Sequence, residues 1–157
     1  GQDQIDFDTT AALNGADTIY DFSVGALASG GDELDLSDLT GITATAIQAN
    51  VTALGGASTL ADNKIYTVNM AAKINGKDYG GADFGDLVGA GKVFAAAIAD
   101  ASEVVILVQG TDESHIYFAN EAITTDGLNT IVSGDIAQIA VLNGVTNADT
   151  FLDVNFV

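Results

Sequence analysis

Hydrophobic and polar residues alternate in the opening part of the chain, over stretches short enough to form β-strands. In Ile5-Asp6-Phe7-Asp8 and in Glu33-Leu34-Asp35-Leu36-Ser37, the strand period of two puts every acidic side chain on the face opposite the apolar ones. Two clusters typical of turns, Asn14-Gly15-Ala16-Asp17 and Ser29-Gly30-Gly31-Asp32, lie between these stretches. We therefore predict that residues 1–41 form short strands with one apolar face and one face of carboxylates.

Strand patterns continue in the rest of the chain, bounded by clusters of glycine, asparagine, aspartate and serine. Gly110–Ser114 is predicted to be the loop of a hairpin between two of these strands. The predicted strands are Lys64–Asn69, Glu103–Gln109, His115–Asn120, Ile136–Leu142 and Phe151–Val157.

Two segments have an apolar repeat near 3.6 residues, which predicts short helices. They are Ile42–Leu54 and Phe84–Ala99, the second with Asp83 as its N-cap and with internal glycines that weaken it. The expected fold class is mainly β. No linker divides the chain, and 157 residues are typical of one domain, so a single domain over residues 1–157 is expected.

The chain is strongly acidic, with 22 Asp and Glu residues against four Lys and Arg and a formal net charge of −18. This charge repels nucleic-acid phosphates and anionic membrane surfaces, so we expect neither a nucleic-acid partner nor membrane insertion. The longest strongly apolar runs, Val93–Ala99 and Val104–Val108, are far shorter than the ~18 residues of a membrane-spanning helix. Cysteine is absent, which excludes disulfides and thiolate metal sites.

The acidic residues gather near the start of the chain, where residues 1–38 contain no basic side chain. Calcium takes six to eight oxygen ligands at about 2.3–2.6 Å, and a divalent ion relieves the repulsion within a row of aspartates. A calcium site is therefore predicted here; the alternative is that the acids only hydrate an exposed sheet face. The carboxylates that lie beside glycine turns are Asp17, Asp21, Asp32, Glu33, Asp35 and Asp38.

Two segments of this acidic part share a motif with a known family. Asp17-Thr18-Ile19-Tyr20-Asp21-Phe22, followed by Gly30-Gly31-Asp32-Glu33-Leu34-Asp35-Leu36-Ser37-Asp38-Leu39, resembles a DxIxDF…GxDxLDLSxL segment. That segment follows the glycine-aspartate nonapeptide repeats of RTX proteins, as in the C-terminal domain of serralysin-type proteases. Ser114–Phe118, Ile136–Val145 and Asp153–Val157 resemble the late strands and the C-terminal end of the same family.

For the fold, the resemblance implies a short, degenerate β-roll-like N-terminal part over residues 1–41. This part continues into a β-sandwich-like sheet body over residues 42–157, with one or two short helices. No intact GGxGxDxUx repeat is present, so a long stacked β-roll is excluded and calcium is expected at a few sites. The resemblance assigns calcium binding to Asp17 and Asp32, with Asp21 and Asp35 as further ligands.

For the biology, the resemblance implies a protein secreted to the extracellular space or the cell surface. An ABC exporter of a type I system would read an uncleaved C-terminal signal, and the chain would fold outside on meeting millimolar calcium. Phe151–Val157 is interpreted both as a last sheet strand and as the tail that the exporter recognises.

Catalytic motifs are absent from the sequence. His115 is the single histidine, which excludes an HExxH zinc site, and no GxSxG nucleophile motif is present. Gly80–Gly85 is rich in glycine but lacks the P-loop lysine. We therefore predict that the chain is not an enzyme. The tyrosines, which could otherwise stack on sugars, are predicted to be core or half-buried sheet residues; they are Tyr20, Tyr66, Tyr79 and Tyr117.

The leading hypothesis is a non-catalytic C-terminal domain of a type I-secreted, calcium-binding bacterial surface or matrix protein, similar to surface-layer or filament proteins. Its roles would be export recognition, calcium-triggered folding and self-assembly. Alternating strands without proline favour homo-oligomers or polymers that form through strand edges. Two alternatives stay open: the accessory domain of a secreted RTX protease or lipase with its catalytic domain upstream, and an adhesin module that binds a glycan.

Overall fold

The structure is a computed structural model, and it describes residues 1–9, 14–39, 42, 47–51, 63–68, 103–110, 112–120, 135–146, 150–151 and 155–156. These residues form strands and one short 3₁₀ helix, so the prediction of a mainly β fold is confirmed. None of the helical turns in this part of the chain has the length and apolar content that crossing a bilayer requires. The elements are β1 (Gln4–Asp6), β2 (Asp17–Ile19), η1 (Leu27–Ser29), β3 (Glu33–Asp35), β4 (Ile47–Val51), β5 (Lys64–Val68), β6 (Glu103–Gln109), β7 (Glu113–Asn120) and β8 (Ile136–Asn143).

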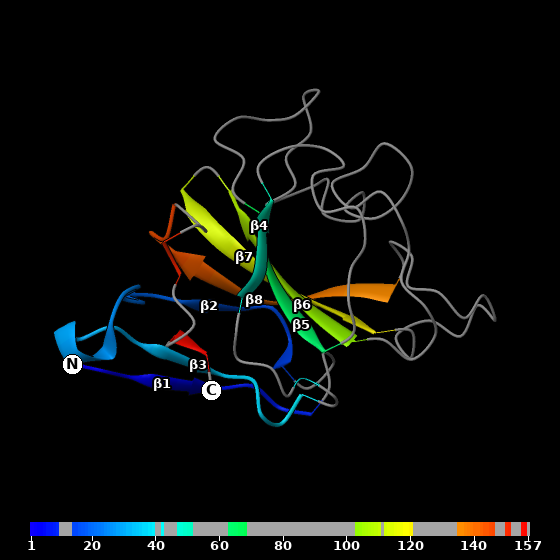
Figure 1. Cartoon of the computed structure of the whole chain (residues 1–157), viewed down its shortest axis with the longest axis horizontal. Helices are drawn as coiled ribbons and strands as arrows, with labels where there is room; N and C mark the ends of the chain where they lie inside the picture. The colour runs from blue at the N-terminus through cyan, green and yellow to red at the C-terminus, as the bar shows by residue number, and fades with distance from the viewer. Residues whose placement is uncertain are drawn as a thin grey trace.

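The strands form two sheets (Figure 1). Sheet A consists of β1 and β3, which run parallel to each other. Sheet B has six strands in the order β2-β8-β7-β6-β5-β4. Its β6–β7 and β7–β8 pairs are antiparallel, and its other pairs are parallel. Because β2 lies between β1 and β3 in sequence but belongs to sheet B, the start of the chain contributes strands to both sheets.

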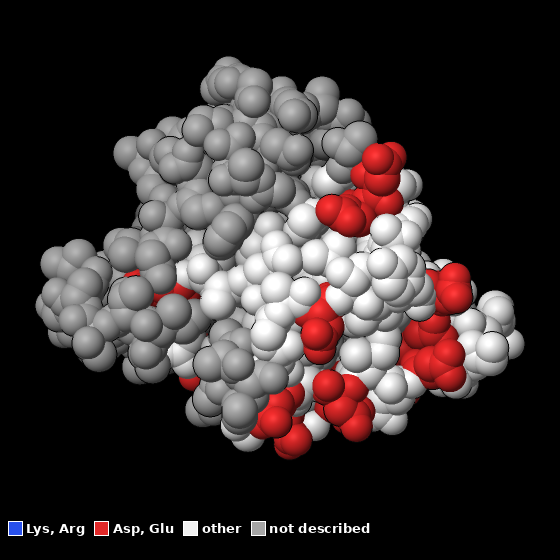
Figure 2. Space-filling model, turned by 180° about the vertical axis from the view of Figure 1, so that it is seen from behind, with Lys and Arg blue, Asp and Glu red and all other residues white. Residues whose placement is uncertain are grey.

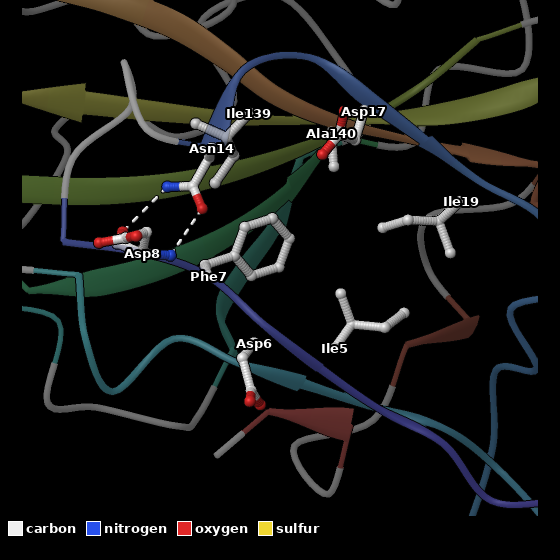
Figure 3. Close-up of a pocket in the computed structure, with 9 residues that line it drawn as sticks. All are labelled: Ile5, Asp6, Phe7, Asp8, Asn14, Asp17, Ile19, Ile139 and Ala140. Atoms are coloured by element: carbon white, nitrogen blue, oxygen red, sulfur yellow. Dashed lines mark hydrogen bonds between the residues drawn. The ribbon is translucent and has the colours of Figure 1, made fainter.

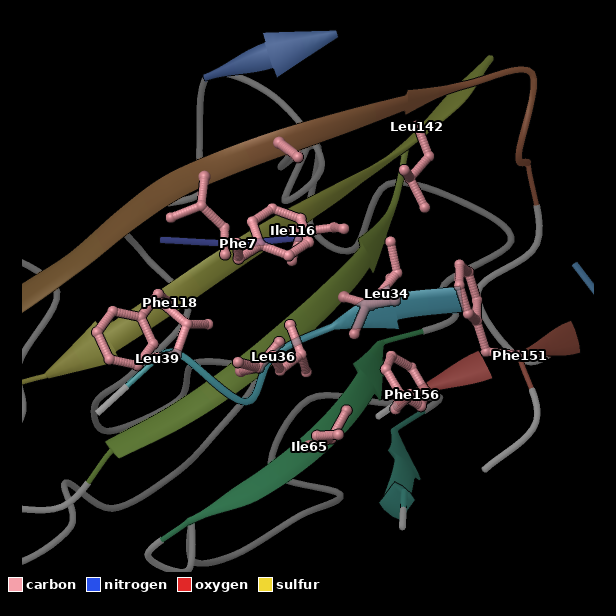
Figure 4. Packing of buried hydrophobic residues seen from close by; sticks show 14 of the residues in the cluster. Phe7, Leu34, Leu36, Leu39, Ile65, Ile116, Phe118, Leu142, Phe151 and Phe156 are labelled. Carbon is pink, nitrogen blue, oxygen red and sulfur yellow. The ribbon is translucent and has the colours of Figure 1, made fainter. Parts of the chain in front are cut away.

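The hydrophobic core lies between sheet A and one face of sheet B (Figure 4). Leu34, at the centre of β3, is fully buried and faces this core. In sheet B, the register places Leu107 beside Ile116 and Val105 beside Phe118, so these four side chains share the inner face. Further members of the cluster are Phe7, Phe22, Leu36, Leu39, Ile42, Ile65, Ile139, Ala140, Leu142, Val145, Phe151 and Phe156.

The strands predicted from alternation and from β-branched runs are confirmed in position. β5 covers Lys64–Val68 of the predicted Lys64–Asn69, and β6 matches Glu103–Gln109 in full. β7 begins two residues before the predicted His115, and β8 ends one residue after the predicted Leu142. The predicted loop Gly110–Ser114 does join β6 to β7 as a hairpin, closed by the hydrogen bond from the Gly110 N–H to the Glu113 carbonyl oxygen, 2.7 Å long, but Glu113 and Ser114 already belong to β7.

The helix predicted over Ile42–Leu54 is wrong, because Ile47–Val51 forms strand β4. This strand hydrogen-bonds in parallel to β5, and such tertiary pairing overrides a weak helical periodicity. The other predicted helix, Phe84–Ala99, lies outside the described residues. Of the predicted strand Phe151–Val157, the structure describes Phe151, Asn155 and Phe156, and Phe156 makes an isolated parallel bridge to Leu34.

We expect Leu34→Ala to lower the free energy of unfolding by about 2–5 kcal/mol, because the truncated side chain leaves a cavity between the two sheets. Thr18→Ala is the control, since Thr18 is exposed on β2 and its loss should cost less than about 0.5 kcal/mol. Urea unfolding measures both. Equal effects would show that Leu34 is not part of a packed core.

Candidate functional site

The outer face of sheet A carries acidic side chains from both of its strands. The parallel register pairs Gln4 with Glu33, Ile5 with Leu34 and Asp6 with Asp35. Ile5 and Leu34 pack against the core, so the alternating Gln4, Asp6, Glu33 and Asp35 side chains lie on the opposite face. We call Asp6, Glu33 and Asp35 the acidic face. Paired strands are about 4.8 Å apart, so the Asp6 and Asp35 carboxylates are neighbours, and like charges directly opposite each other are destabilising.

No basic side chain lies on either strand of sheet A to offset this repulsion. Lys64 is the one lysine in the part of the chain that the structure describes, and it belongs to β5 of sheet B. Figure 2 shows the molecule from behind relative to Figure 1. On this face, Asp and Glu form several patches, and no Lys or Arg is visible among the residues that the figure colours.

Asp35 is held in its ionised form by neutral donors. Gln4 Nε2 donates to its Oδ2 at 2.7 Å, and the Ser37 N–H donates to its Oδ1 at 2.9 Å. The pKa of Asp35 is lowered below 3.8, first by the hydrogen bond from the Ser37 side chain, then by the Ser37 N–H and, in part, by Gln4. For Asp6, by contrast, the described residues provide no hydrogen bond to its carboxylate.

Asp32, one of the predicted calcium ligands, is buried with 3% of its surface exposed. Its Oδ1 accepts the N–H of Asp3 at 2.8 Å and its Oδ2 accepts the N–H of Ser23 at 2.7 Å. Its own N–H donates to the Ser23 carbonyl oxygen at 2.8 Å. One carboxylate thus ties the residue before β1, the loop after β2 and the residue before β3 to each other.

Asn155, near the C-terminal end of the chain, contacts the same loop region as Asp32. Asn155 is fully buried, and its Nδ2 donates to the carbonyl oxygens of Gly25 at 2.9 Å and Asp32 at 2.8 Å. We call the contacts of Asp3, Ser23, Gly25, Asp32 and Asn155 the Asp32–Asn155 junction. Asn155 was not among the predicted site residues, and its signal in the sequence is a single polar residue between Val154 and Phe156.

Aromatic stacking supports the junction from the core side. The ring of Phe151 stacks on Phe22 with 5.7 Å between centroids and on Phe156 with 5.8 Å. Such pairs contribute about 0.5–1.5 kcal/mol beyond the area that they bury. Phe22 belongs to the predicted family motif, so this motif serves packing as well as the acidic surface.

Gly31 explains how the loop before β3 closes so tightly. A Cβ atom at this position would lie 2.2 Å from the carbonyl oxygen of Gly25, far inside van der Waals contact. The Gly31 N–H donates to the Ala26 carbonyl oxygen at 3.3 Å, which completes the turn around η1. The glycine therefore allows the close main-chain approach that brings the Gly25 and Asp32 carbonyl oxygens to the same amide.

A pocket of about 260 Å³ lies between β1, β2 and β8 (Figure 3). In Figure 3, the Ile5, Phe7 and Ile19 side chains point into the same space. The remaining lining residues are Asp6, Asp8, Asn14, Asp17, Ile139 and Ala140. The pocket is therefore lined by apolar side chains and by Asp6, Asp8 and Asp17, of which only Asp17 was a predicted ligand.

The four predicted calcium ligands occupy different places. Asp17 begins β2 at the pocket, and Asp21 is exposed in a left-handed turn with φ of 64°. Asp32 is buried in the junction, whereas Asp35 lies on the acidic face. Among the described residues, no three acidic or histidine side chains are placed to hold one metal ion. The six to eight oxygens of a closed calcium site are therefore not supplied by these four residues together.

His115 lies in the interior of β7, as its strand pattern predicted. Its Nε2 is 3.0 Å from Glu113 Oε1 and its Nδ1 is 3.1 Å from Gln138 Oε1, so both ring nitrogens have oxygen partners. The ring also stacks on Tyr117, with 6.1 Å between centroids. These contacts account for a structural role; the absence of catalysis by His115 stays a prediction.

The prediction for the tyrosines is confirmed for two and wrong for one. Tyr66 and Tyr117 are buried in sheet B. Tyr20 is 68% exposed, because it follows the last residue of β2 and the left-handed turn at Asp21 redirects the chain. Tyr79 lies outside the described residues.

No family model matches the chain, and no curated protein or solved structure matches it either. The resemblance to RTX proteins therefore rests on the motif residues alone.

We expect Asn155→Ala to lower the free energy of unfolding by about 1–3 kcal/mol, because the buried carbonyl oxygen of Asp32 and the partly buried one of Gly25 lose their donor. Asn143→Ala makes the same chemical change at an exposed position at the end of β8 and should be nearly neutral. Chemical unfolding measures both variants. A nearly neutral Asn155→Ala would show that the junction does not hold the C-terminal end.

We expect Ser37→Ala to raise the pKa of Asp35 toward 3.8, because the hydrogen bond from the Ser37 side chain, the largest cause of the lowered pKa, is lost while the Ser37 N–H remains. A lowered pKa in the folded state means that ionised Asp35 stabilises the fold above its unfolded pKa and that this contribution disappears as the pH falls through the folded pKa. Carboxyl ¹³C chemical shifts report the titration. Ser29→Ala is the control, and an unchanged Asp35 titration in Ser37→Ala would contradict the assignment.

Proposed function

We propose that this chain is a non-catalytic, calcium-responsive domain of a secreted bacterial surface or matrix protein, and that it serves export recognition, calcium-triggered folding and self-assembly. The observation that carries the proposal is the in-register pairing of β1 with β3, which sets Asp6 beside Asp35 on an exposed face without a basic neighbour in sheet A. The motif over residues 17–39 supports the extracellular setting by resemblance.

Calcium acts on this face by bridging and by screening. A cation between the Asp6 and Asp35 carboxylates replaces a repulsion between strands with an attraction that both strands share. Two carboxylates with water as the remaining ligands make a weak site, in the range of about 10⁻⁴–10⁻³ M that is usual for extracellular calcium modules. Such an affinity suits a protein that meets calcium only outside the cell.

Folding and calcium binding are linked because the acidic face exists only when β1 pairs with β3. A ligand that binds the folded chain and not the unfolded chain shifts the equilibrium toward the folded state. The Asp32–Asn155 junction sets this pairing, since the Asp32 carboxylate holds the N–H of Asp3, whose carbonyl oxygen accepts the Glu33 N–H at 2.9 Å.

Export recognition, in this proposal, precedes folding. Phe151, Asn155 and Phe156 are buried in the folded chain, so an exporter that reads the tail needs the unfolded form. Calcium outside the cell then favours the folded form and the burial of the tail.

We expect calcium at about 10 mM to raise the melting temperature by about 3–10 °C relative to EDTA, which follows from a Kd of about 0.1–1 mM and from ~2–4 °C per kcal/mol for a domain of this size. Asp6→Asn and Asp35→Asn should each reduce this rise. Asp112→Asn removes an exposed carboxylate from the β6–β7 hairpin and should leave the rise unchanged.

Differential scanning calorimetry with matched ionic strength makes the comparison. Magnesium serves as a second control, because it gives up its water ligands less readily than calcium does. An identical melt in EDTA and in calcium would overturn the proposal. An equal loss of response in all three Asn variants would show that calcium acts on net charge alone and not on the acidic face.

A further inference from the structure

Among the described residues, no strand pairs with the outer edge of β1. In a parallel ladder, alternate residues direct both main-chain groups to the same neighbour. The Glu33 N–H donates to the Asp3 carbonyl oxygen, and the Phe7 N–H donates to the Asp35 carbonyl oxygen. The main-chain groups of the odd-numbered residues of this segment therefore face β3. The main-chain groups of Gln4 and Asp6 therefore point away from β3, toward the unpaired edge of β1, and both residues are exposed. β1 has a partner on one side only in the described part of the chain.

The sequence of this edge is complementary to itself. Consider two copies of Gln2-Asp3-Gln4-Ile5-Asp6-Phe7-Asp8 that run antiparallel with Ile5 opposite Ile5. Gln4 of each copy then lies opposite Asp6 of the other, and Gln2 lies opposite Asp8. On this face of the β1 segment, each acidic side chain then meets a carboxamide that can donate to it, instead of another carboxylate.

We propose that β1 pairs antiparallel with β1 of a second copy of this chain, in the register that sets Gln4 opposite Asp6 and Ile5 opposite Ile5. The pairing joins two copies of sheet A into one sheet of four strands. Gln4 already donates one hydrogen of its amide to Asp35, and the other remains for the partner copy. Ile5 of both copies extends the apolar inner face across the new interface.

Asn14 limits the extent of this pairing. Its Oδ1 accepts the N–H of Asp8 at 2.6 Å, and its Nδ2 donates to the Asp8 carbonyl oxygen at 2.9 Å (Figure 3). The carboxamide thus occupies the place that a residue of an added strand would take at Asp8. It blocks the Gln2–Asp8 pairs and leaves the Gln4–Asp6 pairs, so the interface stays short and reversible.

Edge strands that are short or charged resist strand addition, and β1 is both, with the adjoining main chain of Asp8 covered by Asn14. Charge repulsion between two chains of net charge −18 also opposes the dimer. The dimer is therefore expected at high protein concentration and with that repulsion screened. This inference rests on the self-assembly part of the proposed function and names its surface, but it does not depend on calcium.

Disulfide cross-linking tests the register, because the chain contains no cysteine. An equimolar mixture of Gln4→Cys and Asp6→Cys chains should cross-link several-fold faster than either variant alone. In the proposed register, the two positions are about 5.5 Å apart at their Cα atoms, whereas two Gln4 positions are about 8 Å or more apart. Disulfides rarely span Cα atoms more than about 7 Å apart.

The cross-linking is run in EDTA with about 1 M NaCl, where the screening length is ~3 Å. A missing calcium response in the melting experiment would leave this test intact. Thr18→Cys, on the exposed edge strand β2, replaces either partner as the control. Equal rates for the mixture, the single variants and the control mixture would overturn the proposal.

Asn14→Ala tests the limit on pairing. Removing the carboxamide frees the Asp8 main chain for the Gln2–Asp8 pairs, so sedimentation velocity should show association at least about tenfold tighter than in the unmodified chain. Asn143→Ala is the matched control and should not change association. The Asp8 N–H should exchange with deuterium faster in dilute Asn14→Ala and regain protection as the chain associates. Unchanged association would contradict the role of Asn14.

Discussion

The buried carboxylate of Asp32 is the constraint on which the arrangement of both chain ends depends. It accepts the main-chain N–H groups of Asp3 and Ser23. The side-chain amide of Asn155 donates to the main-chain carbonyl oxygens of Asp32 and Gly25. A buried charge without such partners would cost several kcal/mol, whereas hydrogen bonds to a charged group are among the stronger ones. The junction therefore sets where β1 starts and hence which of its residues lie beside β3.

The register that follows explains why so acidic a chain can have a well-packed interior. Ile5, Phe7, Leu34 and Leu36 face the core, and the carboxylates between them are turned outward. The repulsion is thereby moved to a surface where water, neutral donors and cations can act on it. Asp35 already has Gln4 and Ser37 as donors, whereas the carboxylate of Asp6 accepts no hydrogen bond from the described residues, so the proposed calcium ion would act mainly at Asp6.

The local part of this arrangement could be predicted from sequence. Strict alternation located β1 and β3, and β-branched runs located β5, β6, β7 and β8, because each signal lies within one strand. β4 could not be found in this way, since its conformation depends on pairing with β5. The junction could not be predicted from sequence for the same reason, because Asn155 is 130 residues from Gly25 and 123 residues from Asp32. The predicted ligands lie apart because Asp17 begins β2 of sheet B, Asp32 is buried before β3 and Asp35 belongs to sheet A, and these positions depend on pairing between distant segments.

Calcium binding at the acidic face of sheet A can be tested directly by a calcium titration followed by ¹H–¹⁵N correlation spectra. Binding there predicts saturating shifts, with a midpoint in the range of about 0.1–1 mM, at the amides of Asp6, Glu33 and Asp35 and their neighbours in β1 and β3. Small shifts that grow without saturation and affect Asp112 as much as Asp6 would contradict it.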